Sequence, residues 1–148
     1  MKFTNSLIKG KLLKRYKRFF ADIKVNNKII TAHCPNTGSM QGLLDQGNEV
    51  LVTEHNDPKR KLKFTLEIIK ANKRYVGVNT HRANKIVNHG LENKLISEFK
   101  TIKNIKPEFK FSDDTRFDFL CDNYLIEVKN VTLFRENDIA EFPDAVTS

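Results

Sequence analysis

The chain has 148 residues, of which 39% are hydrophobic and 11 are phenylalanine. This apolar content argues against an intrinsically disordered chain, and a chain of this length can bury the core of one ordinary domain or two small ones. No run of about 18 apolar residues is present, which excludes a membrane span, and charge interrupts the basic N-terminus too often for a secretory signal. We therefore expect a cytoplasmic protein without a membrane partner.

The net charge of +8 is concentrated at the start of the chain. The first 31 residues carry nine Lys or Arg and a single acid, Asp22, which accounts for the whole surplus. Tyr16, Phe19 and Phe20 are interleaved with these basic residues. Such a distribution indicates a polyanionic partner, and nucleic acid before membrane. The alternative is a solvated basic face whose aromatic rings belong to the core.

The first eighty residues have the pattern of a small β-barrel. Apolar or alternating runs bounded by turn residues predict strands at 7–14, 19–25, 28–33, 49–54, 62–70 and 75–79. The stretch 33–44 contains Pro35, Gly38 and Gly42, and it predicts a structured loop or a short helix instead. Closely spaced short strands of this kind are typical of the five-stranded oligonucleotide-binding barrel, the OB-fold, which we predict for residues 1–80.

Basic residues near the expected strand ends are the candidate nucleic-acid contacts. We expect phosphates to be bound by Lys14, Arg15, Lys17, Arg18, Lys59, Arg60, Lys61 and Arg116. Tyr16 or Phe19 is expected to stack on bases. The polar loop 36–39 offers backbone N–H groups as an anion-binding nest, with a well-capped turn as an equal alternative. For residues 59–61 the alternative is a plain solvated loop.

In the second half of the chain the hydrophobic period changes to that of a helix. Residues 84–95 predict one or two helical segments, and residues 102–110 predict a strand in which Pro107 indicates an edge or a bulge. A hairpin follows. This order predicts an α/β half-domain at 81–148, so we expect the whole chain to be α+β.

The two cysteines have no metal-binding spacing around them. Cys34 and Cys121 are therefore expected to be buried free thiols. His33 and Cys34 are neighbours, but adjacent strand residues face opposite ways, so a Cys/His nucleophile pair is not expected.

The segment 116–131 predicts a β-hairpin with its turn at Asp122-Asn123, because both residues tolerate left-handed backbone. The expected register pairs Cys121 with Tyr124, Phe119 with Ile126, Asp118 with Glu127, Phe117 with Val128, and Arg116 with Lys129. Alternation then predicts an apolar face of Phe117, Phe119, Cys121, Tyr124, Ile126 and Val128. The other face carries Arg116, Asp118, Leu120, Leu125, Glu127 and Lys129. Two carboxylates directly opposite each other are unfavourable unless positive charge lies between them.

Asp118, Glu127 and Lys129 follow the pattern Asp, eight residues, then Glu-x-Lys. This resembles the PD-(D/E)xK motif of metal-dependent nucleases of the restriction-endonuclease type. Asp118 and Glu127 would hold Mg²⁺ or Mn²⁺, since such cations prefer carboxylate oxygens, and Lys129 would position or deprotonate the attacking water. The alternative is a charge network in which Arg116 and Lys129 neutralise the two carboxylates.

Several longer blocks carry a closer resemblance. They are RYKRF at 15–19, TAHCPNTGSMQGLL at 31–44, NDPKRKLKFT at 56–65, VGVNT at 76–80, TRFDFL at 115–120, EVKNVTL at 127–133 and FPDAVTS at 142–148. Together they span nearly the whole chain and resemble the sugar fermentation stimulation protein family.

This resemblance implies an OB barrel joined to a nuclease-like domain, in a bacterial or archaeal protein. It also implies binding to DNA without sequence preference and a role in regulating sugar (maltose) metabolism. RNA is the alternative nucleic acid, and an active Mg²⁺- or Mn²⁺-dependent phosphodiesterase is the alternative function. A homo-oligomer is compatible with the sequence.

The resemblance also bears on the site and on the end of the chain. Asp118, Glu127 and Lys129 match the nuclease motif. The acid of the first helix stays undecided among Glu92, Glu98 and Glu108. Family members continue past PDAVT into a basic segment, a helix and a final strand, so we expect 81–148 to be an incomplete nuclease-like domain.

Overall fold

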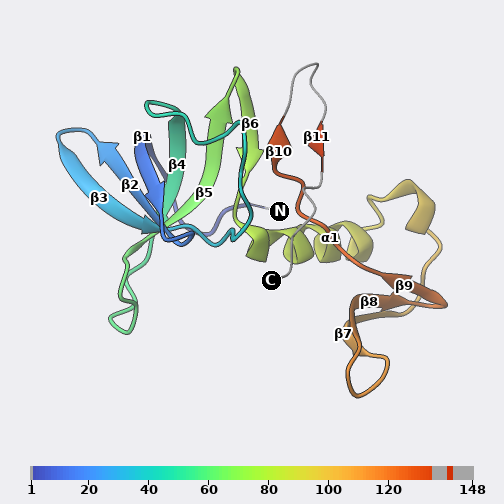
Figure 1. Cartoon of the computed structure of the whole chain (residues 1–148). Coiled ribbons are helices and arrows are strands. Elements are labelled where there is room, and N and C mark those ends of the chain that lie inside the picture. The colour runs from blue at the N-terminus through green and yellow to red at the C-terminus, as the bar shows by residue number, and fades with distance from the viewer. Residues whose placement is uncertain (1, 135–139, 142–148) are drawn as a thin grey trace. The chain divides into compact units, whose positions relative to one another are not determined.

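The computed structural model describes residues 2–134, 140 and 141 (Figure 1). Within them the chain forms two compact units. One comprises residues 2–80 with 130–134, 140 and 141, and the other comprises residues 81–129. The division into domains 1–80 and 81–148 stays a prediction, and the FPDAVTS block lies outside the described residues.

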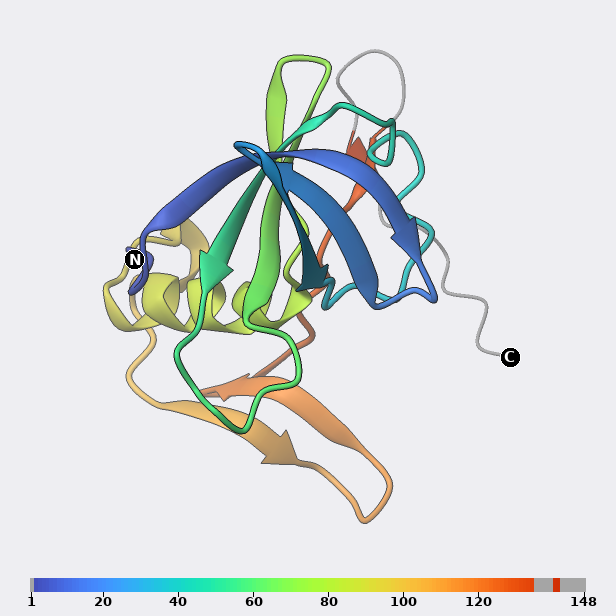
Figure 2. The ribbon, with the colours of Figure 1, turned by 90° about the vertical axis from the view of Figure 1, so that its left-hand side faces the viewer.

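The first unit is built around a closed barrel of five strands. These are β1 (Leu7–Tyr16), β2 (Phe20–Val25), β3 (Lys28–His33), β4 (Glu49–Glu54) and β5 (Phe64–Ala71), and β6 (Arg74–Gly77) extends the sheet. The hydrogen-bonded order is β3-β2-β1-β4-β5-β6, and a parallel pairing of β3 with β5 closes the barrel. This connectivity is that of the OB-fold, and all the strands predicted in the first eighty residues are present. The blue and green strands of Figures 1 and 2 trace the barrel.

Alternating apolar residues fill the interior of the barrel. Among them Leu12, Ile23, Val52, Leu66 and Ile69 are completely buried. The strand register shifts by a residue at two β-bulges, one just after Leu12 in β1 and one between Leu51 and Val52 where β4 pairs with β5. Such bulges let a strand bend around the barrel while its apolar residues keep facing inward.

The stretch predicted as a structured loop packs into the barrel core. Cys34, Met40 and Leu43 are completely buried there. The Oδ1 atom of Asn36 accepts a hydrogen bond from the backbone N–H of Gly38 (2.9 Å), which forms an Asx turn. One of the backbone donors is thereby used within the loop, which favours the capped turn over the anion-binding nest.

Cys34 and Cys121 are both free and buried, as predicted. Burial raises the pKa of each thiol, because the thiolate would lose its hydration. A thiol with a raised pKa forms little thiolate, so we expect both cysteines to react slowly.

The second unit combines one helix with a three-stranded antiparallel sheet. The turn η1 (Thr80–Arg82) precedes α1 (Ala83–Glu92), and η2 (Ser97–Phe99) precedes β7 (Ile105–Lys110), β8 (Arg116–Cys121) and β9 (Tyr124–Ile126). The strand order is β7-β8-β9. Leu91 of α1 forms a buried cluster with Phe119 and Cys121 of β8, so the helix covers one face of the sheet. The predicted α+β class is confirmed.

The boundaries of the second unit differ from the predicted ones by a few residues. The helix ends at Glu92, because Lys94 adopts left-handed backbone, with φ of 54°. The backbone N–H groups of Lys94 and Leu95 donate to the carbonyl oxygens of Leu91 (3.1 Å) and Gly90 (2.8 Å), which is the Schellman pattern of a helix C-terminus. Two short strands, β10 (Leu133–Phe134) and β11 (Ala140–Glu141), pair with each other in the first unit and were not predicted. In the described part of the chain, no helix has the length and apolar character needed to cross a membrane.

Gly10 lies in β1 at a position with no room for a side chain. A Cβ atom there would lie 2.5 Å from Cγ2 of Ile23 and 3.0 Å from the carbonyl oxygen of Lys24. We therefore expect Gly10→Ala to lower the free energy of unfolding by about 1–3 kcal/mol, because the barrel wall must move to admit the methyl group. Gly77→Ala is the matched control, since nothing lies within 4 Å of its Cβ position. Equal urea midpoints for the two variants would contradict this packing.

Candidate nucleic-acid surface and metal centre

Two loops of the barrel adjoin strand residues that pair with the end of β3. Residues 17–19 join β1 to β2, and residues 55–63 join β4 to β5. His33, the last residue of β3, pairs with Phe20 beside the first loop and with Thr65 beside the second. Barrel closure therefore places two loops that are far apart in sequence on either side of the same strand end. We call these two loops the basic rim.

Most of the predicted phosphate contacts lie on the basic rim and are exposed. They are Lys17, Arg18, Lys59, Arg60 and Lys61. Lys17 and Arg18 adopt left-handed backbone, with φ of 48° and 62°, and so close the tight turn between β1 and β2. In OB-folds these same two loops flank the oligonucleotide-binding face.

Arginine side chains brace both loops of the rim. The guanidinium group of Arg15 donates to the carbonyl oxygen of Asn36 (2.7 Å) and, through two nitrogens, to that of Arg18 (2.9 and 3.2 Å). Arg60 donates to the hydroxyl oxygen of Thr65 (2.9 Å). Both arginines therefore determine the shape of the rim in addition to supplying charge.

A buried polar cluster anchors the start of the second loop. The Nε2 atom of His55 lies 3.2 Å from the hydroxyl of Thr53 and 3.1 Å from that of Thr65. Thr53 also donates to Glu67 (2.8 Å), whose other oxygen accepts a hydrogen bond from Asn79 (2.8 Å). Glu67 is only 2% exposed, and a buried carboxylate is tolerated when such donors surround it. The sequence pattern of β5 did not predict that Glu67 would be buried.

The hairpin that carries the candidate metal ligands forms around the predicted turn. Asp122 adopts left-handed backbone, with φ of 47°, and the pairs Cys121–Tyr124 and Phe119–Ile126 have the predicted register. β9 ends at Ile126, so the pairing of β8 with β9 stops there. The predicted pairs Asp118–Glu127, Phe117–Val128 and Arg116–Lys129 were wrong as ladder pairs. The two carboxylates do not face each other across a regular hairpin.

The apolar face of the hairpin is largely as predicted. Phe119 and Cys121 are buried, with Ile126 and Val128 packed against them. Tyr124 differs, because its side chain is exposed and its ring meets that of Phe99 edge to face, with centroids 5.8 Å apart. Phe117 is half-buried outside this cluster, and its ring meets that of Phe111 edge to face, with centroids 5.9 Å apart.

The side chain of Asp118 explains where the ladder stops. Its Oδ2 atom accepts a hydrogen bond from the backbone N–H of Val128 (2.7 Å), a donor that a longer ladder would direct to a backbone carbonyl. Its Oδ1 atom accepts a hydrogen bond from Nδ2 of Asn84 in α1 (2.5 Å). Asp118 is thus held by Asn84 of α1 and by the backbone of the segment that follows β9. Asn84 was missed by sequence reasoning, because a single Asn near a helix start carries no distinctive signal.

The remaining charges of the hairpin are paired locally. Lys129 donates to Glu127 (2.7 Å), and Arg116 lies 3.7 Å from Glu108 of β7. Among the residues that the structure describes, no three His, Cys, Asp or Glu side chains are arranged to hold a metal ion. A metal held here by described residues would therefore take no more than two ligands from these residue types.

The three acids left undecided by the sequence lie in different surroundings. Glu92 accepts a hydrogen bond from Asn88 one turn earlier in α1 (2.9 Å). The pKa of Glu98 is lowered by a hydrogen bond from the Ser97 hydroxyl (2.7 Å). Glu108 has left-handed backbone, with φ of 51°, and lies between the pairs Pro107–Phe119 and Phe109–Phe117 of the β7–β8 ladder. Of the three, Glu108 is the one in register with Asp118.

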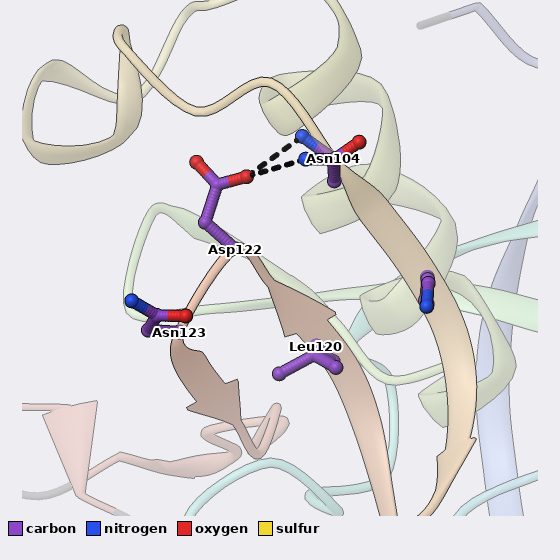
Figure 3. A pocket seen from close by; sticks show the side chains of 5 residues that line it. Asn104, Leu120, Asp122 and Asn123 are labelled. Atoms are coloured by element: carbon purple, nitrogen blue, oxygen red, sulfur yellow. Dashed lines mark hydrogen bonds between the residues drawn. The ribbon is translucent and has the colours of Figure 1, made fainter.

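A pocket of the second unit lies at the hairpin turn and not at Asp118 (Figure 3). It is lined by Asn104, Lys106, Leu120, Asp122 and Asn123. The carboxylate of Asp122 accepts hydrogen bonds from the backbone N–H of Asn104 (3.0 Å) and that of Lys103 (3.1 Å). These bonds hold the pKa of Asp122 below its usual range. Asp122 therefore fastens the turn to the chain before β7, which is a structural role.

Comparison with known proteins places the chain in a family. The family model described as "SfsA N-terminal OB domain" matches residues 13–78, and the one described as "Sugar fermentation stimulation protein RE domain" matches residues 81–148. A sugar fermentation stimulation protein homolog of Ruegeria pomeroyi is 40% identical, with 100% of this chain and 67% of the relative covered. The chain belongs to the sugar fermentation stimulation protein family. A homolog of Pelagibacter ubique is 63% identical, with 100% of this chain and 66% of that protein covered.

The family also has a solved structure similar to this chain. The structure of Pyrococcus furiosus SfsA in complex with Ca²⁺ gives a TM-score of 0.68 at 21% identity. The likeness covers 82% of this chain and 51% of that one, and it shows the fold. This family member thus spans 66% of the length of its Pelagibacter relative and about half of the Pyrococcus chain.

The contact between Asn84 and Asp118 is testable by substitution. Hydrogen bonds to charged groups contribute about 1.5–3 kcal/mol, so we expect Asn84→Ala to lower the free energy of unfolding by about that amount. Asn88→Ala is the matched control on the same helix, because its amide donates to the exposed Glu92, and a change within about 0.5 kcal/mol is expected. Chemical denaturation measures both. Equal losses would show that Asn84 does not support Asp118.

Proposed function

We propose that this chain binds DNA without sequence preference through its barrel, with RNA as the alternative ligand. The observation that carries the proposal is that the exposed cations of residues 17–19 and 55–63 lie in two loops that flank the same end of β3. We further propose that the stimulation of sugar fermentation expressed in the relatives' name follows from this DNA binding, and that this chain regulates maltose metabolism in the same way.

The chemistry of the basic rim suits the phosphate backbone. Lys17, Lys59 and Lys61 carry compact ammonium charges, which attract phosphate without the fork geometry that reads base edges. The two braced arginines have part of their guanidinium groups committed to the protein itself. Binding dominated by phosphate contacts depends on salt and is nearly the same for unrelated sequences.

Salt dependence tests this proposal directly. The dissociation constant for DNA oligonucleotides of unrelated sequence is expected to rise steeply with salt, because binding releases the counterions of the phosphates. Lys61→Ala should weaken binding to all sequences alike and reduce the slope against the logarithm of salt concentration by about 1. Lys9→Ala is the matched control, since Lys9 on β1 lies outside the two rim loops and its ammonium group is already paired with the carboxylate of Glu49 (2.6 Å). A flat salt dependence, or no binding at low ionic strength, would contradict the proposal.

We also propose that the second unit holds Mg²⁺ or Mn²⁺ at Asp118 and Glu127, which is the basis of the alternative function as a phosphodiesterase. Both oxygens of Asp118 keep a lone pair after their hydrogen bonds to Asn84 and Val128. Mg²⁺ commonly takes one or two carboxylates and retains several waters, so the carboxylates of Asp118 and Glu127 are enough to bind it. The Pyrococcus relative in complex with Ca²⁺, another cation that binds oxygen, supports a divalent site.

In this alternative the chain's own groups have distinct roles. Asp118 is the pre-positioned ligand, because the helix and the backbone of Val128 hold its carboxylate. Glu127 would exchange its ion pair with Lys129 for the metal, and Lys129 would then orient the attacking water or a phosphate oxygen. A bound metal would supply neutralisation of phosphate charge and a lower pKa for a coordinated water.

Metal binding and cleavage can be measured separately. Asp118→Asn and Glu127→Gln are each expected to weaken Mn²⁺ binding at least about tenfold in calorimetry, because each removes one charged ligand. Both are also expected to abolish metal-dependent cleavage of DNA or RNA. Glu98→Gln is the control, because Glu98 is an acid outside the proposed site, and it should leave Mn²⁺ affinity unchanged. Glu108→Gln tests whether the acid in register with Asp118 also contributes to binding. Mn²⁺ affinity unchanged by both Asp118→Asn and Glu127→Gln would end this alternative.

A further inference from the structure

The outer face of β1 and β2 carries an aromatic pair beside cations. The β1–β2 register pairs Tyr16 with Phe20 and Lys14 with Asp22, which places these four side chains on one face. Ala21, between Phe20 and Asp22, is completely buried. Because side chains alternate along a strand, the face that carries the aromatic pair is the outward one.

Three aromatic rings are kept on or beside this face. The rings of Tyr16 and Phe20 stack with centroids 5.5 Å apart and an interplanar angle of 19°. Phe19, in the adjoining turn, is 45% exposed. A cross-strand aromatic pair stabilises its hairpin, which accounts for the stack alone. This stabilisation does not explain Phe19, because Phe19 belongs to the turn and not to the cross-strand pair. An aromatic ring that stays exposed also contributes little to the stability of the core.

The ring of Tyr16 is held in one orientation. Its hydroxyl lies 3.3 Å from Oδ1 of Asp22, and the hydroxyl of Thr31 on β3 donates to the same oxygen (2.8 Å). The ammonium group of Lys14 lies 5.2 Å from the ring centroid and 3.6 Å from Oδ2 of Asp22. Asp22 is the acid in the basic first 31 residues, and here it positions the ring and the lysine. A ring fixed in this way loses little entropy when another ring stacks on it.

Cations surround the aromatic pair on the same barrel. Lys11 and Lys24 are paired across β1 and β2 and are both exposed, and the turn 17–19 of the basic rim begins directly after Tyr16. Alternating rings and positive charges on a strand face are typical of surfaces that bind single-stranded nucleic acid, where bases stack and phosphates are neutralised. A duplex keeps its bases stacked inside and presents only phosphates and groove edges, so it would leave flat rings on a sheet without a partner.

We propose that this face binds unpaired nucleotides in preference to a duplex. Bases stack on Phe19 and on the Tyr16–Phe20 pair, while phosphates contact Lys14, Lys24 and the basic rim. The inference rests on the proposed binding of DNA and deepens it by naming the strandedness of the ligand. The stacking chemistry is common to DNA and RNA, so the shared ligand is a single strand of either kind.

Fluorescence anisotropy with the full chain tests the preference. The probes are a labelled DNA strand of mixed sequence and about 15 nucleotides, the same strand as a duplex, and the corresponding RNA strand. We expect the single strand to bind about tenfold more tightly than the duplex, which corresponds to one stacked base. Phe19→Leu, which removes the ring but keeps an apolar side chain, is expected to lose about tenfold in single-strand affinity and less than about twofold for the duplex.

The controls separate a stacking surface from a stability effect. Tyr75→Ala removes another ring of the barrel that is exposed and has the ammonium group of Lys70 5.0 Å from its centroid, and single-strand affinity should not change. Tyr16→Phe keeps the ring and loses its bond to Asp22, so it should retain most of the preference for the single strand. Thermal unfolding of each variant identifies any loss of the barrel itself.

The possible outcomes separate this inference from the function on which it rests. Duplex binding that equals or exceeds single-strand binding would overturn the inference and leave DNA binding intact. Equal losses for both probes in Phe19→Leu would also overturn it. If no probe binds at low salt, the proposed function itself fails. A single-strand preference with RNA tighter than DNA supports the inference and names RNA as the ligand.

Discussion

The parallel pairing between β3 and β5 is the contact on which the arrangement of the barrel depends. It consists of Ala32 with Phe64 and His33 with Thr65, at the end of one strand and the start of the other. Without it the six strands would form an open sheet, and the two loops of the basic rim would have no common neighbour. Bringing β3 and β5 together closes the chain segment between them, which costs chain entropy. The burial of apolar side chains in the barrel interior must offset this cost. A very short pairing thus decides where the positive charge of the chain collects.

Local pattern was sufficient for the elements of the barrel and insufficient for its closure. Each strand buries one face, and this requirement alone imposes the period of two that located the strands. The closure depends on how far each strand bends, and that is determined by the bulges after Leu12 and between β4 and β5. A bulge adds one residue without changing the composition of a strand, so an alternation pattern does not reveal it.

The candidate site shows the same division between local and non-local effects. The Asp122 turn and the two pairs beside it were predictable, because turn chemistry acts over a few residues. The register failed at Asp118, where a side chain took the backbone donor of Val128 that the ladder needed. In the same way, the sequence identified Arg15 as a cation, but its contact with the carbonyl of Asn36 requires a loop folded back beside β1. Side chains that bond backbone from a distance are the common reason for these differences.

The turn between β1 and β2 has a consequence for how the barrel can be stabilised. Lys17 and Arg18 both occupy left-handed backbone, which costs a residue with a Cβ atom roughly 1–2 kcal/mol relative to right-handed backbone. Asn-Gly would meet the same geometry with much less strain. The chain therefore has two cations where conformational preference alone would select uncharged residues, and Arg15 holds the carbonyl of Arg18 in place. Replacing Lys17 and Arg18 by Asn and Gly would therefore stabilise the barrel but remove two positive charges from the basic rim. At this turn, a gain in thermostability costs charge that phosphate binding would use.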